Sequence, residues 1–342
     1  MELLPDDLLA RVFGREIVPT LRLVCRTWKR VYDANLTTLD KSESHLTLPL
    51  ARVVALWPGL TTLRLRVQPT TVPQLPDLRS LRDLRILSVT CGADVPSLTT
   101  LIHLTQLRRL TVITAYADLH FLRQMCWLDS LSVDRSFQTR GLDLACFPCT
   151  LKELQLERCY PSGQAPAMSR INHLCLGQTY HYRCDVSWVQ RWDTLTEIVL
   201  EEVHILSLSF LRGLPGLQKL TLFLLNTRDT SAAVDDLLAS LSDLTFLRLE
   251  HTYCSDGHLT QAPLRALPRL VDLRLDTPNA TCLGDIALCT GLTRLCLQDV
   301  TDFTSLSRLS NLRLFELSWC EPFELPLNWH TVLHPNTQFE LL

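Results

Sequence analysis

Cysteine and histidine side chains, which can bind zinc or act as nucleophiles, gather in the middle of the sequence. Cys146 and Cys149 have the Cys-x-x-Cys spacing that can bring two thiolates to one metal ion. The further candidates are Cys159, His173, Cys175, His181 and Cys184. A second Cys-x-x-Cys pair, which would complete a typical zinc site, is absent from the sequence. We therefore expect these residues to be core or loop side chains, and we predict no metal site and no cofactor.

Other catalytic motifs are also absent from the sequence. It contains neither a Gly-rich phosphate-binding loop nor the G-x-S-x-G motif of a hydrolase nucleophile. Histidine, aspartate and serine residues occur, but nothing in their spacing brings them to a common site. We predict that the protein has no catalytic residues and is not an enzyme.

The composition indicates a soluble protein whose charges are nearly balanced. The 342 residues include 33 basic and 36 acidic side chains, with a net charge of −3, which favours neither nucleic acid nor an anionic membrane. No apolar run is long enough to span a bilayer. The first residues, MELLPDDLLARVF, lack the basic region and cleavage site of a signal peptide. The 13 cysteines are scattered, as in a reducing compartment. We expect a cytoplasmic or nuclear protein.

A repeat defines the elements that position the other side chains. The segment Leu104–Val112 reads LTQLRRLTV, and its last residues alternate between apolar and polar, as in a strand with one buried face. Its first strand position recurs every 20 to 27 residues. The copies are Leu63, Leu87, Leu110, Leu131, Leu154, Leu174, Ile198, Leu220, Leu247, Leu273, Leu295 and Phe315, with Phe339 as a possible last one. A period of about 20–29 residues with an L-x-x-L-x-L core is the signature of leucine-rich repeats.

The repeat predicts an α/β fold, a horseshoe-shaped solenoid with parallel strands on its concave face. About 12 to 13 repeats would occupy residues 41–342 as one continuous domain. Residues 46–48 are a candidate for an irregular first strand, and residues 323–342 for a C-terminal cap. Residues 231–241 have the apolar spacing of a helix. Segments that contain proline are expected to be extended or short 3₁₀ pieces.

The concave face is the predicted binding surface. Side chains alternate along a strand, so the residue between two buried ones projects from this face. That column reads Arg64, Ser88, Thr111, Ser132, Gln155, Cys175, Val199, Thr221, Arg248, Arg274, Cys296 and Glu316. Glutamates flank it in two repeats, which predicts that a partner with a basic segment binds there; the alternative is an ordinary solvated sheet face. The predicted target-binding residues are Glu153, Glu157, Glu197, Glu201, Arg248 and Arg274.

The first 40 residues have a helical period instead. Apolar residues are spaced for one face of a helix in two segments. Pro5 suits the first position of the first helix, and Thr20 is suited to cap the second. The apolar positions are Leu4, Leu8, Leu9, Val12 and Phe13 in the first segment, and Leu21, Val24, Cys25, Trp28, Val31 and Tyr32 in the second.

The two segments, LLPDDLLARVF and LRLVCRTWKRV, resemble an F-box, and the whole chain resembles F-box proteins of the leucine-rich-repeat type. The resemblance implies that residues 1–40 bind a Skp-type adaptor and, through it, a cullin. The protein would then be the substrate-recognition subunit of an SCF-type ubiquitin ligase, with the target on the repeats. The residues that match the family's positions are Leu4, Pro5, Leu8, Leu9, Val24, Cys25 and Trp28. The loop Gly14–Pro19 is about three residues shorter than the usual F-box spacing.

Two other interpretations of the N-terminal helices are open. The helices can simply cap the end of the solenoid, as every repeat stack requires, which would make the protein a non-catalytic interaction scaffold. The second helix also resembles the start of a box recognised by elongin-type adaptors, through Leu21 and Cys25. That box has an aliphatic residue four positions after the cysteine, where this chain has Lys29.

Overall fold

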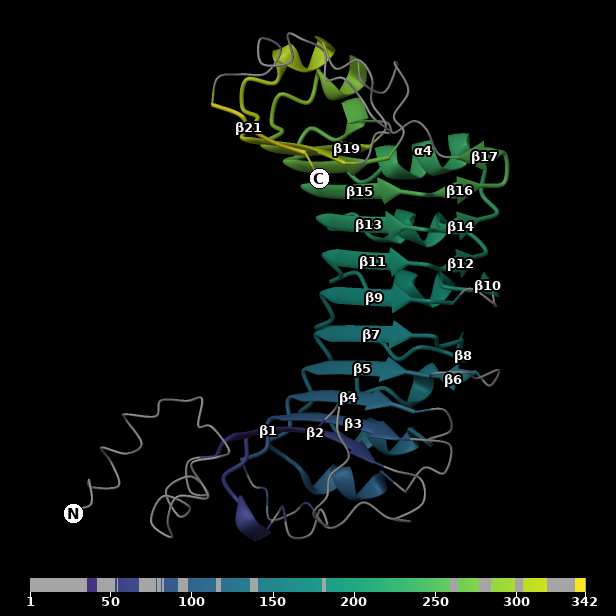
Figure 1. Ribbon diagram of the computed structural model, residues 1–342. Coiled ribbons are helices and arrows are strands. Elements are labelled where there is room, and N and C mark those ends of the chain that lie inside the picture. The colour runs from purple at the N-terminus through teal and green to yellow at the C-terminus, as the bar shows by residue number, and fades with distance from the viewer. Residues whose placement is uncertain are drawn as a thin grey trace, which may run out of the picture. The chain divides into compact units, whose positions relative to one another are not determined.

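The computed structural model describes residues 36–41, 53, 55–67, 78, 81, 83–91, 98–114, 118–135, 141–179, 183–258, 264–276, 284–298, 304–318 and 336–341 (Figure 1). The chain divides into two compact units. The first comprises Met1–Gln138 and Cys146–Leu151, and the second comprises Thr139–Ala145 and Lys152–Leu342. The predicted N-terminal helices lie outside the described residues.

The first unit contains a parallel sheet whose strands follow the order of the sequence. Its strands are β1 (Thr38–Lys41), β2 (Thr62–Val67), β3 (Ile86–Cys91), β4 (Arg109–Ile113) and β5 (Ser130–Asp134). The candidate strand at residues 46–48 lies outside the described residues. The first described strand is β1, which the repeat pattern does not predict and which crosses the predicted domain boundary between residues 40 and 41.

The second unit contains a longer parallel sheet, again in sequence order (Figure 1). Its strands are β7 (Glu153–Glu157), β9 (His173–Gly177), β11 (Glu197–Glu201), β13 (Lys219–Phe223), β15 (Phe246–Glu250), β18 (Asp272–Leu275), β19 (Arg294–Gln298), β20 (Leu314–Ser318) and β21 (Gln338–Leu341). The first strand positions predicted from the repeat are paired in register, from Leu154 with Leu174 through to Phe315 with Phe339. The predicted parallel ladder of leucine-rich repeats is therefore confirmed within each unit, and Phe339 belongs to a last strand.

The leucines spaced by three residues before each strand form consecutive 3₁₀ turns. In one repeat the amides of Leu101, Leu104 and Leu107 each donate to the carbonyl three residues earlier, at 3.0 Å. A 3₁₀ helix has three residues per turn, so side chains three apart lie on one side and point into the core together. The 3₁₀ helices are η2 (Thr99–His103), η3 (His120–Gln124), η4 (Leu144–Cys146), η5 (Ser187–Arg191), η6 (Ser209–Gly213), η7 (Leu264–Ala266) and η8 (Thr304–Arg308).

The segment with the apolar spacing of a helix, residues 231–241, contains the α-helix α4 (Ser231–Ala239). The hydroxyl of Thr230 caps it by accepting from the amide of Ala233 at 3.3 Å. Val234, Leu237 and Leu238 are buried on its inner face. This segment has room for a helix because its repeat, from Leu220 to Leu247, is the longest in the series.

Short strands beside the main sheet form two further ladders that the sequence does not predict. The first pairs β6 (Leu142–Asp143) with β8 (Pro161–Ser162). The second contains β10 (Arg183–Cys184), β12 (His204–Ile205), β14 (Asn226–Thr227) and β16 (Tyr253–Cys254) in parallel, and ends with β17 (Gly257–His258), which is antiparallel to β16. In Figure 1 the strands β12, β14 and β16 lie in line with β11, β13 and β15 of the longer sheet.

A residue with positive φ ends each of five consecutive strands of the second unit. These residues are Arg158, Gln178, Glu202, Leu224 and His251, with φ between 50° and 56°. None is glycine, and such a conformation is unfavourable for residues with a side chain. The ladder compensates, because the first four donate their amide to a backbone carbonyl of the next repeat at 2.8–3.0 Å. The chain can therefore leave the sheet in the same direction in each of these repeats.

Candidate binding face of the sheet

The side chains that project from the main sheet form columns across the strands. Because the strands are in register, the residue between the two buried positions of each strand lies beside its equivalents in neighbouring repeats. This confirms the predicted column within each unit: Arg64, Ser88, Thr111 and Ser132 in the first, and Gln155, Cys175, Val199, Thr221, Arg248, Arg274, Cys296 and Glu316 in the second. We call this side of the second unit's sheet the open face.

The four predicted glutamates lie on either side of strand β9. Glu153 and Glu157 belong to β7, Glu197 and Glu201 belong to β11, and β9 pairs with both strands. Two strand spacings of about 4.8 Å separate the two pairs. The residue of β9 between Glu157 and Glu201 is Gly177, so no side chain separates these carboxylates.

The glutamates differ in how far they are neutralised. Glu197 has two basic neighbours: its Oε2 lies 3.5 Å from Lys219 Nζ and 3.5 Å from Nδ1 of His173, which carries a charge only when protonated. Glu157 accepts a hydrogen bond at 3.0 Å from the side-chain amide of Gln155 on the same strand. Within the described part of the chain, no side chain pairs with the carboxylate of Glu153 or Glu201. These two therefore have most of their charge available to a partner.

The pKa of Cys175 on β9 is affected by the carboxylates of β7 and β11. Burial raises the pKa of its thiol to about 12, and the carboxylates of Glu157, Glu201 and Glu197 add to the effect in that order. A thiol with such a pKa is uncharged at neutral pH and is a poor nucleophile. Cys175 therefore has the environment of a packing residue.

The two predicted arginines lie further along the open face and are paired with carboxylates of their own strands. Arg248 donates to Glu250 at 2.6 Å, and its guanidinium lies 4.5 Å from the centre of the Phe223 ring. Arg274 Nε is 3.9 Å from Asp272 Oδ1. The structure thus brings Arg248 and Arg274 side by side and separates them from the glutamates by strand β13.

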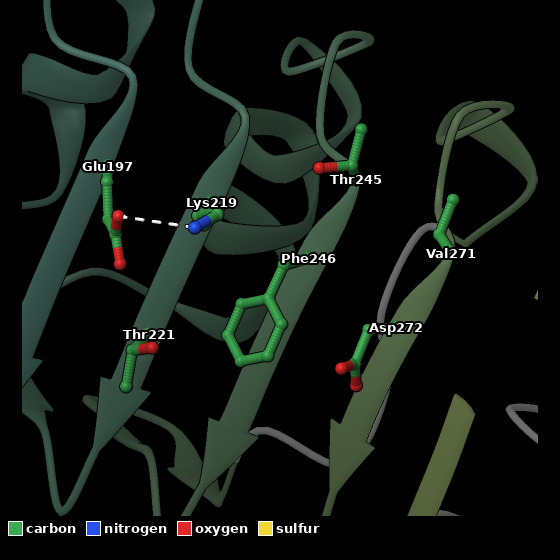
Figure 2. A pocket seen from close by; sticks show the side chains of 7 residues that line it. All are labelled: Glu197, Lys219, Thr221, Thr245, Phe246, Val271 and Asp272. Carbon is green, nitrogen blue, oxygen red and sulfur yellow. Dashed lines mark hydrogen bonds and ion pairs between the residues drawn. The ribbon is translucent and has the colours of Figure 1, made fainter. Parts of the chain in front are cut away.

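A hollow of about 490 Å³ opens on the same face and was not predicted from the sequence (Figure 2). It lies across β11, β13, β15 and β18, at the ends where these strands begin. Its lining residues are Glu197, Lys219, Thr221, Thr245, Phe246, Val271 and Asp272. Phe246 lies between Lys219 and Asp272 in register, so the hollow combines an aromatic ring with charged groups on both sides. An aromatic residue immediately before the first strand position, Leu247, was the available signal, but its neighbours depend on the register.

The residues considered for a metal site differ in their burial. Cys146, Cys159 and Cys184 are buried, and Cys149 is exposed. Among the residues that the structure describes, no three histidine, cysteine, aspartate or glutamate side chains are arranged to hold a metal ion. His181 lies outside those residues. The absence of catalytic activity stays a prediction.

The predicted adaptor-binding residues cannot be placed in the same way. Leu4, Pro5, Leu8, Leu9, Val24, Cys25 and Trp28 all lie outside the described residues. Their role therefore rests on the sequence motif. Among the described helices, none has the length and hydrophobicity that a membrane-spanning segment requires.

Comparison with known proteins shows similarity at the level of the fold. No protein-family model matches the sequence, and no curated protein does. An internalin from Listeria monocytogenes is similar over 91% of this chain and 93% of its own, with 15% identity and a TM-score of 0.50. The functional domain of InlJ from the same bacterium has a TM-score of 0.48 and 18% identity, over 84% of this chain and 65% of its own. A chain of the Toll–Spatzle complex of Drosophila has a TM-score of 0.49 and 13% identity, over 91% of this chain and 52% of its own.

The fold follows from the sequence repeat, the parallel ladders and the likeness to the first of these structures. A repeat of 20 to 27 residues, one strand in each, with the leucines of strand and 3₁₀ turn buried, is the architecture of leucine-rich repeats. The chain has the fold of a leucine-rich-repeat solenoid, with parallel strands and few helices.

Proposed function

We propose that the protein is a non-catalytic binding protein whose open face holds a protein segment rich in basic side chains. The observation that supports this most directly is the pair of carboxylates, Glu153 and Glu201, without a partner side chain among the described residues. They belong to the two strands that flank β9, whose outward residues are His173, Cys175 and Gly177, so a basic segment laid across β9 can reach both carboxylates. Solenoid repeats commonly use such extended surfaces for binding.

A peptide-display selection on the intact chain tests this proposal. Peptides enriched in lysine and arginine are the expected result, and they should lose at least about tenfold in affinity for a Glu153→Arg/Glu201→Arg variant. A matched Asp193→Arg/Asp243→Arg variant changes the same charge at exposed positions outside the open face and should bind them nearly as well. Failure to enrich basic peptides, or equal binding by both variants, would contradict the proposal.

We further propose that this binding serves a substrate-recognition subunit of an SCF-type ubiquitin ligase in the cytoplasm or nucleus. The support is the N-terminal motif, Leu4-Pro5 followed by Val24-Cys25-Arg26-x-Trp28, which resembles an F-box. In this role the N-terminal helices pack in an apolar groove of a Skp-type adaptor, and the adaptor binds a cullin. The protein acts by tethering, which raises the local concentration of target lysines near the ubiquitin-charged enzyme.

Calorimetry with a purified Skp-type adaptor tests the ligase role. The intact chain should bind, and a Pro5→Ala/Trp28→Ala variant that retains the thermal unfolding of the parent should lose at least about tenfold in affinity, since buried tryptophans dominate many interfaces. A Trp188→Ala variant changes a tryptophan of the second unit and should bind like the parent. Without adaptor binding by the intact chain, the scaffold function with N-terminal helices as a cap replaces the ligase role.

A further inference from the structure

The ring of Phe246 lies in the hollow between oppositely charged neighbours. Lys219 and Asp272 flank it in register, and Glu197 is the register neighbour of Lys219 on the far side (Figure 2). The lining includes two carboxylates and one ammonium group, which gives it a net negative charge. Since Lys219 is 3.5 Å from Glu197, its charge is already directed to that side of the hollow.

The carboxylate of Asp272 lacks close hydrogen-bond donors among the described residues. Its side chain is 17% exposed, and its closest cations are Arg294 at 3.6 Å and Arg274 at 3.9 Å, both beyond hydrogen-bond distance. Within the described ranges no donor makes a hydrogen bond to this carboxylate. Burial raises its pKa, against the lowering effect of Arg294 and Arg274. A further cation with well-placed donors would therefore be stabilised here.

The chain itself shows how such a surface holds an arginine. Phe223 lies between Glu201 and Glu250 in register. The guanidinium of Arg248 lies over its ring at 4.5 Å and donates to Glu250 at 2.6 Å. Phe246 has the equivalent combination of ring and adjacent carboxylate, yet no guanidinium of the described residues lies over it. The side chain of Val271, which is 40% exposed, adds apolar surface at the edge of the hollow.

We infer that the hollow binds an arginine side chain of the partner protein, with the guanidinium stacked on Phe246 and hydrogen-bonded to Asp272. The aliphatic part of the arginine packs against Val271. Arginine fits better than lysine because its planar group stacks on a ring and donates two parallel hydrogen bonds to a carboxylate. The inference rests on the proposed function and names one residue type that the partner presents.

The test uses the full chain and short peptides as probes. The peptide acetyl-GGRGG-amide is titrated at low salt and followed by ligand-observed NMR, beside versions with citrulline or lysine in place of arginine. Citrulline has nearly the shape of arginine without its charge. We expect the arginine peptide to bind at least about fivefold more tightly than the citrulline peptide, and more tightly than the lysine peptide.

Two variants and a matched control locate the binding. Phe246→Leu and Asp272→Asn should each weaken the arginine peptide at least about fivefold. Glu316→Gln is the control, because Glu316 also pairs with Arg294, at 3.8 Å, but does not line the hollow. It removes one negative charge and frees the same arginine, and it should change the affinity less than twofold. Thermal unfolding of each variant checks that it folds.

The inference is overturned if the arginine peptide does not bind, if citrulline binds equally well, or if Glu316→Gln weakens binding as much as Asp272→Asn. Its failure differs from failure of the proposed function. If basic peptides selected on the open face bind the parent and the Phe246→Leu variant equally, the binding function stands and the arginine site is wrong. If the selection yields no basic peptides, the function itself is contradicted.

Discussion

The carboxylate of Glu157 lies against the backbone of Gly177 on the neighbouring strand. A Cβ atom built on Gly177 would meet Glu157 Oε2 in a clash and would lie 2.7 Å from its carboxyl carbon. Glycine at this position therefore lets an acidic side chain lie flat across strand β9. The shape of the open face and the position of its charge are linked through this one residue.

Replacing Gly177 with alanine should displace Glu157. Because the obstructing group is the end of a flexible side chain, we expect a loss of only about 1 kcal/mol in unfolding free energy, but at least about fivefold weaker binding of basic peptides. Gly216→Ala is the matched control, since a Cβ there meets nothing within 4 Å. Urea unfolding and peptide titration measure the two effects. Unchanged peptide binding by Gly177→Ala would show that the position of Glu157 is unimportant.

The thiol of Cys175 should react slowly with alkylating reagents. Its pKa is raised to about 12, so very little thiolate is present at pH 8, and iodoacetamide should label it at least about tenfold more slowly than the exposed Cys126. Replacing Glu157 and Glu201 with glutamine removes two causes of the raised pKa and should accelerate the labelling severalfold. Mass spectrometry of tryptic peptides gives the rates. Equal rates for Cys175 in both proteins would mean that the carboxylates do not act on the thiol.

Asp235 on α4 should make the protein less stable as the pH rises from about 4 to about 6. Burial raises its pKa from 3.8 to about 6, with further contributions from Asp236 and Asp256. In this pH range the folded state holds a proton that the unfolded state has lost, so unfolding becomes easier as the pH rises.

An Asp235→Asn variant should lack this decline and be more stable at pH 7. Solvent screening of a partly exposed group limits the gain to about 1 kcal/mol. Asp193→Asn, at an exposed position, serves as the control and should behave like the parent. Thermal unfolding at several pH values measures the difference. A variant with the same pH profile as the parent would rule out the assigned titration.

Replacing Asp276 with alanine should destabilise the protein. It is 4% exposed and accepts from the amide of His251, where earlier repeats use a backbone carbonyl. His251 Nδ1 also lies 3.2 Å from its Oδ2. Asp276→Ala should cost about 1–3 kcal/mol, because it removes the acceptor for the amide of a residue with positive φ.

Asp276→Asn keeps an acceptor oxygen and should cost clearly less than the alanine variant. Asp243→Ala removes a carboxylate from a surface pair with Arg269 and should stay within about 0.5 kcal/mol of the parent. Denaturant unfolding compares the three. If Asp276→Ala and Asp243→Ala were equally mild, the hydrogen bond to His251 would contribute nothing to stability.

Most of the fold could be predicted from the sequence because its signals are local. The alternation of each strand and the leucines three residues apart before it are visible within a dozen residues, and both correspond directly to a strand and to 3₁₀ turns. The recurrence of the first strand position, from Leu63 to Phe315, then predicts the register, since equivalent residues of parallel repeats lie side by side. The outward column, which includes Arg248 and Glu316, follows from the same alternation. The F-box-like motif and its adaptor stay a prediction that depends on the sequence alone.

Tertiary structure decided which of these outward side chains act together. The sequence pattern groups Glu153, Glu157, Glu197 and Glu201 by type, but the structure gives Glu197 an ion pair with Lys219 and leaves Glu153 and Glu201 without an ion pair among the described residues. The hollow around Phe246 depends on contacts between residues more than 20 positions apart. Strand β1 was not predicted because it has Lys41 where the repeat has its second buried residue, and the strands of the short ladders contain only two residues each. Such features arise only when backbone hydrogen bonds bring the repeats into register, because their residues are neighbours in space and not in sequence.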